Sequence, residues 1–248
     1  MNRTSRFASW CIGFSLLIFF WELAGRENWL GSAWPSLSAL FAFMQDPSSA
    51  ALLLRSSADT ASNATIGFLL GSLVGFTLAC SGSVWTGLGP GLATFATFVN
   101  ATPLIALGPL LIVTVGEEVT PAATAGLAVF FSVFIATLSG LQDTNRDQSD
   151  VLSIYGSGKI RALICVRIPN AMPKVMDGLK LGTTAAVLGA IIGEWFGAPT
   201  GLGVILVSAM QNFQIELLWA SALCGTVLSG LSFFLLAAIQ TQFIKRLV

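Results

Sequence analysis

The stretch that decides the fold is residues 64–81, which read ATIGFLLGSLVGFTLACS. It carries no charge and approaches the length of about 20 apolar residues that a helix needs to cross a bilayer. Gly67, Gly71 and Gly75 stand four residues apart and form two overlapping GxxxG patterns. Such small residues let a second helix approach closely inside a membrane. The stretch therefore predicts a membrane span that packs tightly in a bundle, an interpretation favoured over a specific dimer face.

The rest of the chain has the same apolar character. Of the 248 residues, 54% are hydrophobic and 10% are charged, against about 25% charged residues in soluble domains. The mean hydropathy is +0.81. We expect an all-α integral membrane protein that forms a single transmembrane domain over residues 1–248, with about six transmembrane helices. The expected spans are residues 7–24, 64–81, 91–113, 121–141, 179–196 and 215–239, with a charged loop at 142–178 between the fourth and fifth.

Basic residues are shared unequally between the two sides of this arrangement. Six spans place both termini on one side, together with the loops after the second and fourth spans. Ten of the twelve basic residues fall on that side: Arg3, Arg6, Arg146, Lys159, Arg161, Arg167, Lys174, Lys180, Lys245 and Arg246. Because Lys and Arg in short loops mark the cytoplasmic side, we expect both termini and the 142–178 loop in the cytoplasm.

The third expected span has an irregular middle, where Pro103 follows Asn100 and Thr102. Backbone groups that are freed at membrane depth are tolerated only against protein or a water-filled cavity. Two interpretations stay open. These three residues line a pathway or gate, or the proline kink is packed inside the bundle.

Glu194 lies near the outer end of the fifth expected span and is the one clear acid inside an otherwise apolar segment. An ionisable group within a membrane span is a candidate functional residue by default. A structural or gating role is favoured here over direct contact with a substrate.

The charged loop reads as two short amphipathic helices. Val151, Ile154 and Tyr155 recur at helical spacing and predict one apolar face. Gly156 follows where a left-handed helix end is expected, and a second helix is expected to end before Pro169. Helices this short have little stability alone, so they need a partner surface, either the base of the bundle or another protein.

The same loop contains Asp150-Val-Leu, three residues, Gly156, nine residues, and then Val166-Arg-Ile-Pro169. This pattern resembles the signature of the membrane subunits of bacterial ABC importers, which is EAA, three residues, Gly, nine residues and Ile-x-Leu-Pro. The glycine and the proline match, whereas Asp replaces Glu and Val-Leu replaces the alanine pair. Asn63 departs from the nitrate, sulfonate, taurine and pyrimidine-precursor branch, which often has arginine there. Other segments resemble that branch: residues 67–71, 103–116, 169–173, 178–182, 193–194 and 201–203.

In such importers the signature loop forms a coupling helix that enters a cleft of the ATP-binding subunit. The resemblance therefore implies a membrane-spanning permease subunit of an ATP-driven importer, located in the bacterial cytoplasmic (inner) membrane. It would form half of the pathway for a small polar solute. The implied partners are ATP-binding subunits, a second permease copy or paralogue, and an extracytoplasmic solute-binding protein. The residues implied in coupling are Asp150, Val151, Ile154, Tyr155, Gly156, Lys159, Arg161 and Pro169.

Other functions are less well supported by the sequence. A stand-alone small carrier or channel, which is the alternative, predicts buried charge pairs or a filter motif, and the spans offer neither. An intramembrane enzyme ranks last, because the chain has no histidine and no recognisable nucleophile–base pair, so we expect no catalytic residue and no metal ligand. The segment from Gly156 to Ile160 lacks the residues of a phosphate-binding loop. ATP and Mg²⁺ are therefore expected in the partner subunits, with no cofactor in this chain and no nucleic-acid partner.

Overall fold

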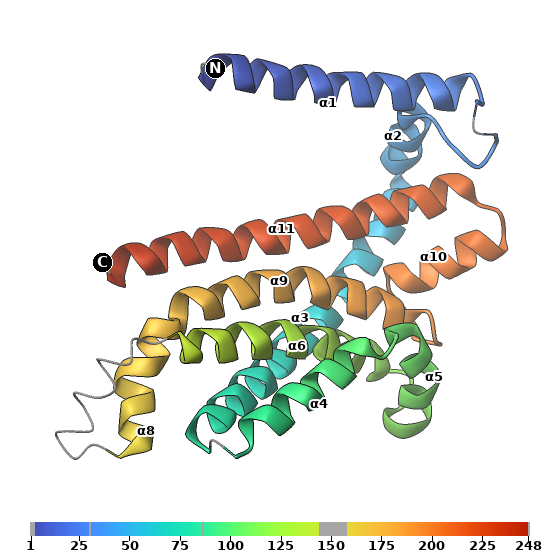
Figure 1. Ribbon diagram of the computed structural model, residues 1–248. Helices are drawn as coiled ribbons and strands as arrows, with labels where there is room; N and C mark the ends of the chain where they lie inside the picture. The colour runs from blue at the N-terminus through green and yellow to red at the C-terminus, as the bar shows by residue number, and fades with distance from the viewer. Residues whose placement is uncertain (1–2, 30, 86, 144–157, 248) are drawn as a thin grey trace.

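The computed structural model describes residues 3–29, 31–85, 87–143 and 158–247, with side chains for 12–29, 31–85, 87–143 and 158–242. All regular structure in those ranges is helical (Figure 1). The elements are α1 (Arg3–Arg26), α2 (Leu37–Gln45), α3 (Pro47–Val84), α4 (Gly89–Ala101), α5 (Leu104–Val115), α6 (Thr120–Gln142), α8 (Lys159–Ala162), the π-helical η1 (Leu163–Arg167), α9 (Ile168–Glu194), α10 (Leu202–Gln211) and α11 (Ile215–Leu247).

Four helical segments of the described chain are long and apolar enough to cross a membrane. They are α3, α6, the continuous segment from α8 to α9, and α11 up to residue 242. The pair α4 and α5 passes the same test together as a broken span. Helix α1 has 24 residues, which corresponds to about 36 Å at 1.5 Å per residue. The expected all-α membrane fold is confirmed.

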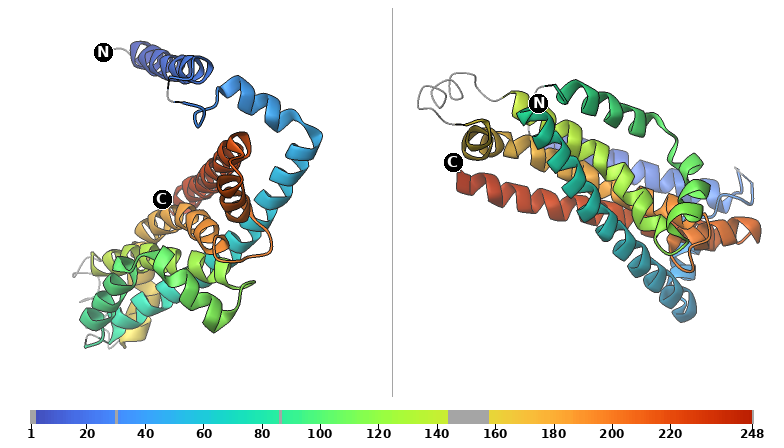
Figure 2. Two further views of the ribbon diagram at one scale, coloured as in Figure 1. Left: turned by 90° about the vertical axis from the view of Figure 1, so that its right-hand side faces the viewer. Right: turned by 90° about the horizontal axis from the view of Figure 1, so that it is seen from below.

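The core lies where α3, α6 and α9 meet, and α3 crosses the other two obliquely (Figure 2). A methyl group on Gly67 would collide with the Ala125 side chain, and one on Gly71 would collide with the carbonyl of Gly126. The glycine face predicted from residues 64–81 therefore lies directly against α6, which confirms tight packing. The buried residues around it are small or β-branched: Ala64, Ala125, Val129, Val133, Ala186, Val187 and Ala190.

Residues 47–62, which precede the second expected span and are rich in serine, are helical. Helix α3 begins at Pro47, where Asp46 caps it by accepting a hydrogen bond from the backbone N–H of Ser49 (3.0 Å). Along the helix, hydroxyl groups bond back to their own backbone, as Ser57 does to the Leu53 carbonyl (2.7 Å). Several serines and threonines are accommodated in this way, and the predicted span at 64–81 is only a part of a longer helix, Pro47–Val84.

The span expected at residues 91–113 is broken in its middle, where the sequence predicts an irregular stretch. Helices α4 and α5 meet at an angle of 98°. The break falls at Thr102 and Pro103, where Thr102 is extended (φ −76°, ψ 123°). Proline has no N–H to continue the helix and disfavours helical geometry in the residue before it, so the chain turns there.

The expectation that a helix ends before Pro169 is wrong. The chain remains helical from Lys159 to Glu194. A π-helical turn, η1, precedes the proline, and the N–H of Ile168 bonds to the carbonyl of Leu163, five residues back. Pro169 then falls in the first turn of α9, where its missing N–H does not interrupt the helix.

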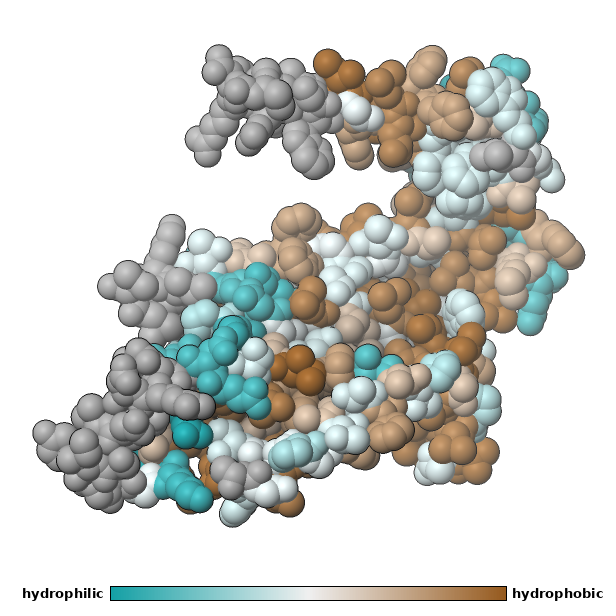
Figure 3. Space-filling view, in the orientation of Figure 1, coloured by the Kyte–Doolittle hydropathy of each residue, from teal (hydrophilic) through white to brown (hydrophobic). Residues whose placement is uncertain are grey.

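Helix α1 lies apart from the bundle and is fastened at its C-terminal end (Figure 1). Trp21 packs against Trp34 and Trp219, with ring centroids 4.7 and 5.2 Å away. The indole N–H groups of Trp21 and Trp219 donate to the carbonyls of Pro35 and Ala33. Figure 3 shows that hydrophilic residues gather at the opposite end of the molecule, around α8 and the start of α9.

Candidate functional site

Glu194 is the centre of a buried junction between three helices. Its side chain is only 1% exposed. Oε2 accepts hydrogen bonds from the hydroxyl of Thr60 (2.9 Å) and the backbone N–H of Gly203 (2.9 Å). Oε1 accepts one from the side-chain amide of Asn63 (3.3 Å). The carboxylate thus joins the last turn of α9 to α3 and to the first turn of α10.

The start of α10 is shaped around this carboxylate. Gly201 has φ +132° and ψ 167°, a backbone conformation that is essentially restricted to glycine. A Cβ on Gly201 or Gly203 would also collide with the Glu194 side chain or the backbone beside it. The N–H of Leu202 donates to the Thr60 hydroxyl (2.8 Å). Free N–H groups at a helix N-terminus favour an anion, and here Glu194 of a neighbouring helix supplies it.

A second acid stands beside the junction. Asp59 directly precedes Thr60, which donates to Glu194, in α3. Its Oδ2 atom is buried and has no hydrogen-bond partner within the described residues. The junction and the turn of α3 beside it therefore hold two carboxyl groups.

The other pathway candidates lie at the bend between α4 and α5. Asn100, Thr102 and Pro103 are all exposed. The Thr102 hydroxyl bonds to the Phe98 carbonyl of its own helix (2.9 Å). In the described part of the chain no hydrogen bond joins these residues to Glu194, so the structure does not bring the four candidates into one site. Helix α5 does contact the outer end of α9, where Gly108 lies directly against the ring of Phe196.

The coupling candidates fall partly outside the described residues. Asp150, Val151, Ile154, Tyr155 and Gly156 lie in the range 144–157, which the structure does not describe. Of the remaining three coupling candidates, Lys159 and Arg161 are exposed on α8, and Pro169 is exposed in the first turn of α9. The side chains of Ile160 and Ile164 are also exposed, by 64% and 59%. The exposed residues of α8 and η1 thus include both basic and apolar side chains.

The base of α9 is tied to two other helices. The guanidinium of Arg167 donates to the hydroxyl of Ser83 at the end of α3 (3.1 Å). The ammonium of Lys174 donates to the hydroxyl of Ser139 at the end of α6 (3.1 Å) and pairs with Asp143. A displacement of α8 would therefore reach α3 and α6 as well as α9.

Sequence reasoning missed the partners of Glu194. Thr60 and Asn63 lie 134 and 131 residues before it, and nothing in their spacing points to a glutamate in another helix. Two features of the sequence are weak indications of this junction. Thr60 and Asn63 are three residues apart, so they share a helix face, and Gly201 and Gly203 recur shortly after Glu194.

Comparison with known proteins shows what this arrangement is similar to. A family model described as "Binding-protein-dependent transport system inner membrane component" matches residues 67–248. A probable ABC transporter permease protein of Haemophilus influenzae is 29% identical over 180 residues, 72% of this chain and 74% of that protein. A putative aliphatic sulfonates transport permease protein of Escherichia coli is 25% identical over 244 residues, 98% of this chain and 90% of that protein.

A shorter match and a solved structure extend this likeness. A formylaminopyrimidine transport permease protein of Halalkalibacterium halodurans is 32% identical over 113 residues, 45% of each chain. The solved structure belongs to the MetNI methionine ABC transporter in an inward-facing conformation. It matches with a TM-score of 0.68 and 14% identity, over 83% of this chain and 100% of that one. At this identity the match shows a shared fold.

Proposed function

From the premise that the chain belongs to the family of binding-protein-dependent transport system inner membrane components, we propose how it works within an importer. It is a multi-pass permease subunit of an ABC importer of the nitrate and sulfonate branch. We propose that it is one non-enzymatic transmembrane domain that forms half of the pathway for a small polar solute. A second copy or a paralogue supplies the other half, a solute-binding protein delivers the solute, and separate subunits bind ATP and Mg²⁺.

The observation that carries this proposal is the continuous helical segment from Lys159 to Glu194. Its 36 residues are helical without a break, and the helix axis turns between α8 and α9 (Figure 1). One end carries the exposed Lys159 and Arg161, and the other end carries the buried Glu194 junction. A helical element that joins these two sites without a break can carry a displacement from the ATPase side to the outer end of the bundle.

We place the contact with the ATPase in the loop that precedes this segment. Its apolar face would be buried in a groove of the partner, as in other helix-in-groove contacts, and its basic residues would lie at the rim, where charge governs specificity. Both chain termini lie on the same, cytoplasmic side in this proposal. The proposed coupling residues are Asp150, Val151, Ile154, Tyr155, Gly156, Lys159, Arg161 and Pro169.

At the outer end we assign Glu194 to positioning and gating. Its three hydrogen bonds fix α10 and α3 against α9, so a tilt of α9 would move all three together. Asn100, Thr102 and Pro103 stand at a sharp bend in the chain, and we assign them to the wall of the pathway.

The experiment compares two neighbouring glycines. Gly156→Val should reduce co-purification of the ATPase, because a β-branched residue at a left-handed helix end is strained by about 1–3 kcal/mol. The matched control is Gly158→Val. Gly158 has an ordinary φ of −67° and open space around a Cβ, so this variant should assemble normally.

The readouts are ATPase stoichiometry in mild detergent and solute-stimulated ATP hydrolysis after reconstitution of the whole importer. Normal values for both variants would remove the loop from coupling. A wild-type chain that purifies and transports without any ATPase would instead favour a stand-alone carrier.

A further inference from the structure

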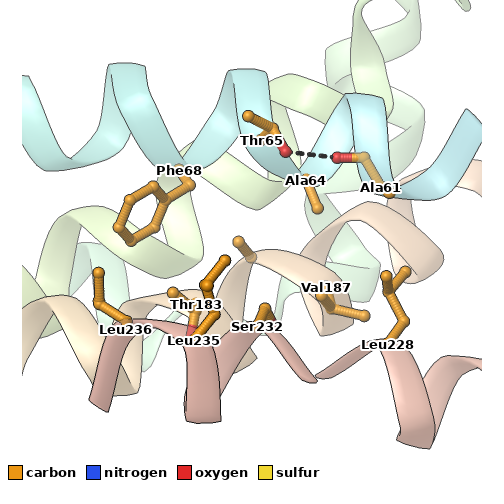
Figure 4. Close-up of a pocket in the computed structure, with 11 residues that line it drawn as sticks. Ala61, Ala64, Thr65, Phe68, Thr183, Val187, Leu228, Ser232, Leu235 and Leu236 are labelled. Carbon is orange, nitrogen blue, oxygen red and sulfur yellow. Dashed lines mark hydrogen bonds between the residues drawn. The ribbon is translucent and has the colours of Figure 1, made fainter. Parts of the chain in front are cut away.

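An apolar groove lies between α3, α9 and α11 (Figure 4). Its volume is about 210 Å³. The walls include Ala61 and Phe68 from α3, Thr183 and Val187 from α9, and Leu228 and Ser232 from α11. All three helices are membrane-spanning segments, and the lining residues lie well inside them, so the groove is surrounded by the bilayer.

Two contacts between α9 and α11 lie on either side of the groove along α11. Near the outer end, a Cβ on Gly225 would lie 3.0 Å from the side chain of Ile191. Near the inner end, the amide of Gln240 donates to Asp177 (3.0 Å). The groove is therefore bounded along α11 by one contact on each side.

The polar groups in the groove are already satisfied. The hydroxyl of Thr65 donates to the Ala61 carbonyl (2.7 Å), the bond drawn in Figure 4. Thr183 donates to the carbonyl of Lys180 (2.7 Å) and Ser232 to that of Ser229 (2.9 Å). A polar solute would lose its hydration here and find no free hydrogen-bond donor, which is costly. The chemistry of the lining fits a hydrocarbon.

The groove is also continuous with the exposed apolar surface of α11. Leu235, one of its lining residues, is 66% exposed. The neighbouring Val227, Leu231 and Phe234 are exposed by 58%, 64% and 70%. A hydrocarbon chain lying along this surface could enter the groove without leaving apolar surroundings. A dry cavity of about 150 Å³ already accommodates a benzene molecule, so 210 Å³ has room for a segment of a longer chain.

We propose that this groove binds one acyl chain of a membrane phospholipid. The chain fills the space between α11 and the pair α3–α9, and supplies the van der Waals contacts that the three helices do not make with one another there. The proposal requires only that the protein spans a membrane, and it does not depend on the solute, the ATPase or the coupling loop.

The test uses photoactivatable lipid and the full chain. The protein is reconstituted in vesicles of phosphatidylethanolamine and phosphatidylglycerol that contain a phosphatidylethanolamine with a diazirine in the middle of one acyl chain. After illumination, adducts are assigned to single residues by mass spectrometry. Thr183, Ala186 and Val187 form the floor of the groove and are at most 9% exposed. Leu181 and Leu188 of the same helix are each 60% exposed and report ordinary contact with lipid.

We expect adducts on the floor residues as well as on the two exposed leucines. Ser232→Phe, which fills the groove from α11, should lower floor labelling about tenfold, since it displaces several buried methylene groups. Ser232→Leu serves the same purpose if the larger side chain disturbs folding. Ala222→Phe on the exposed surface of α11 is the matched control and should leave floor labelling unchanged. Labelled leucines beside an unlabelled floor would overturn the proposal, whether the groove is empty or filled by a second copy of the chain.

Discussion

At the scale of single residues, the chemistry of Glu194 differs from that of an acid exposed to a pore. Its carboxylate is buried and accepts three hydrogen bonds from two other helices. A buried donor that loses its acceptor costs about 1–3 kcal/mol. The residue therefore joins α3, α9 and α10 by hydrogen bonds, which is the basis of the positioning role proposed for it.

Glu194→Ala should lower the free energy of unfolding by about 3 kcal/mol, because it leaves several buried donors without an acceptor. Glu194→Gln should cost less than about 1.5 kcal/mol, since the Gln oxygen can replace Oε2 and the Asn63 amide can turn to accept from the new NH₂ group. Thermal unfolding in detergent measures both effects. Glu194→Gln should still assemble and should slow transport in vesicles. Equal stability of the two variants would contradict the proposed junction.

A substitution of Gly201, the residue before α10, tests the same junction by its effect on stability. Gly201→Ala should destabilise the protein by about 1–3 kcal/mol through backbone strain, with an added loss because the new methyl group meets Glu194. Gly197→Ala is the control. Gly197 also has a positive φ (+104°), but a Cβ there would make only ordinary contact with Glu117 at 3.7 Å. Thermal unfolding should show a clearly larger loss at 201, and equal losses would exclude a role for the steric contact.

At the scale of elements, the glycine face of α3 sets how closely α3 and α6 approach. Gly71 faces the backbone of Gly126 with no room for a Cβ. A methyl group at such a contact must push two backbones apart. The approach of these two helices in turn fixes the core beneath them, where Ala125 and Val129 are fully buried.

Gly71→Ala should destabilise the bundle by about 1–3 kcal/mol, as overpacking does elsewhere. Gly230→Ala in α11 is the matched control, because no atom lies within 4 Å of a Cβ at that position. Replacing that helical glycine should even stabilise the protein by about 0.5–1 kcal/mol. Opposite shifts of the unfolding temperature are expected, and a neutral result at 71 would contradict the close packing of α3 on α6.

At the scale of the whole molecule, charge separates along the axis of the bundle. Ten basic residues fall on one expected side of the membrane and two on the other. Among the acids, four accompany the ten, and eight lie on or near the opposite side. The net charge of zero thus combines about +6 on one expected side with about −6 on the other. The uneven distribution of Lys and Arg, rather than the net charge, predicts the orientation of the chain.

This orientation can be tested by labelling single cysteines in a background without the four native ones. Cysteines at positions 3, 159 and 245 should react with an impermeant maleimide only after the membrane is opened. Cysteines at positions 46 and 117, where Asp46 and Glu117 are exposed, should react in intact cells. Reaction at 159 in sealed cells would reverse the proposed orientation and the coupling assignment together.

The sequence by itself determined the all-α membrane fold, the tight packing at residues 64–81 and the likeness to importer permeases. These follow from hydrophobicity, glycine spacing and motif spacing, which are properties of neighbouring residues. Tertiary structure alone decided that Thr60 and Asn63 meet Glu194, that α4 and α5 turn by 98°, and that the chain stays helical through Pro169. The reason is physical. A buried carboxylate takes whichever donors the fold brings to it, and a proline bends, ends or continues a helix according to the carbonyls and neighbouring helices around it.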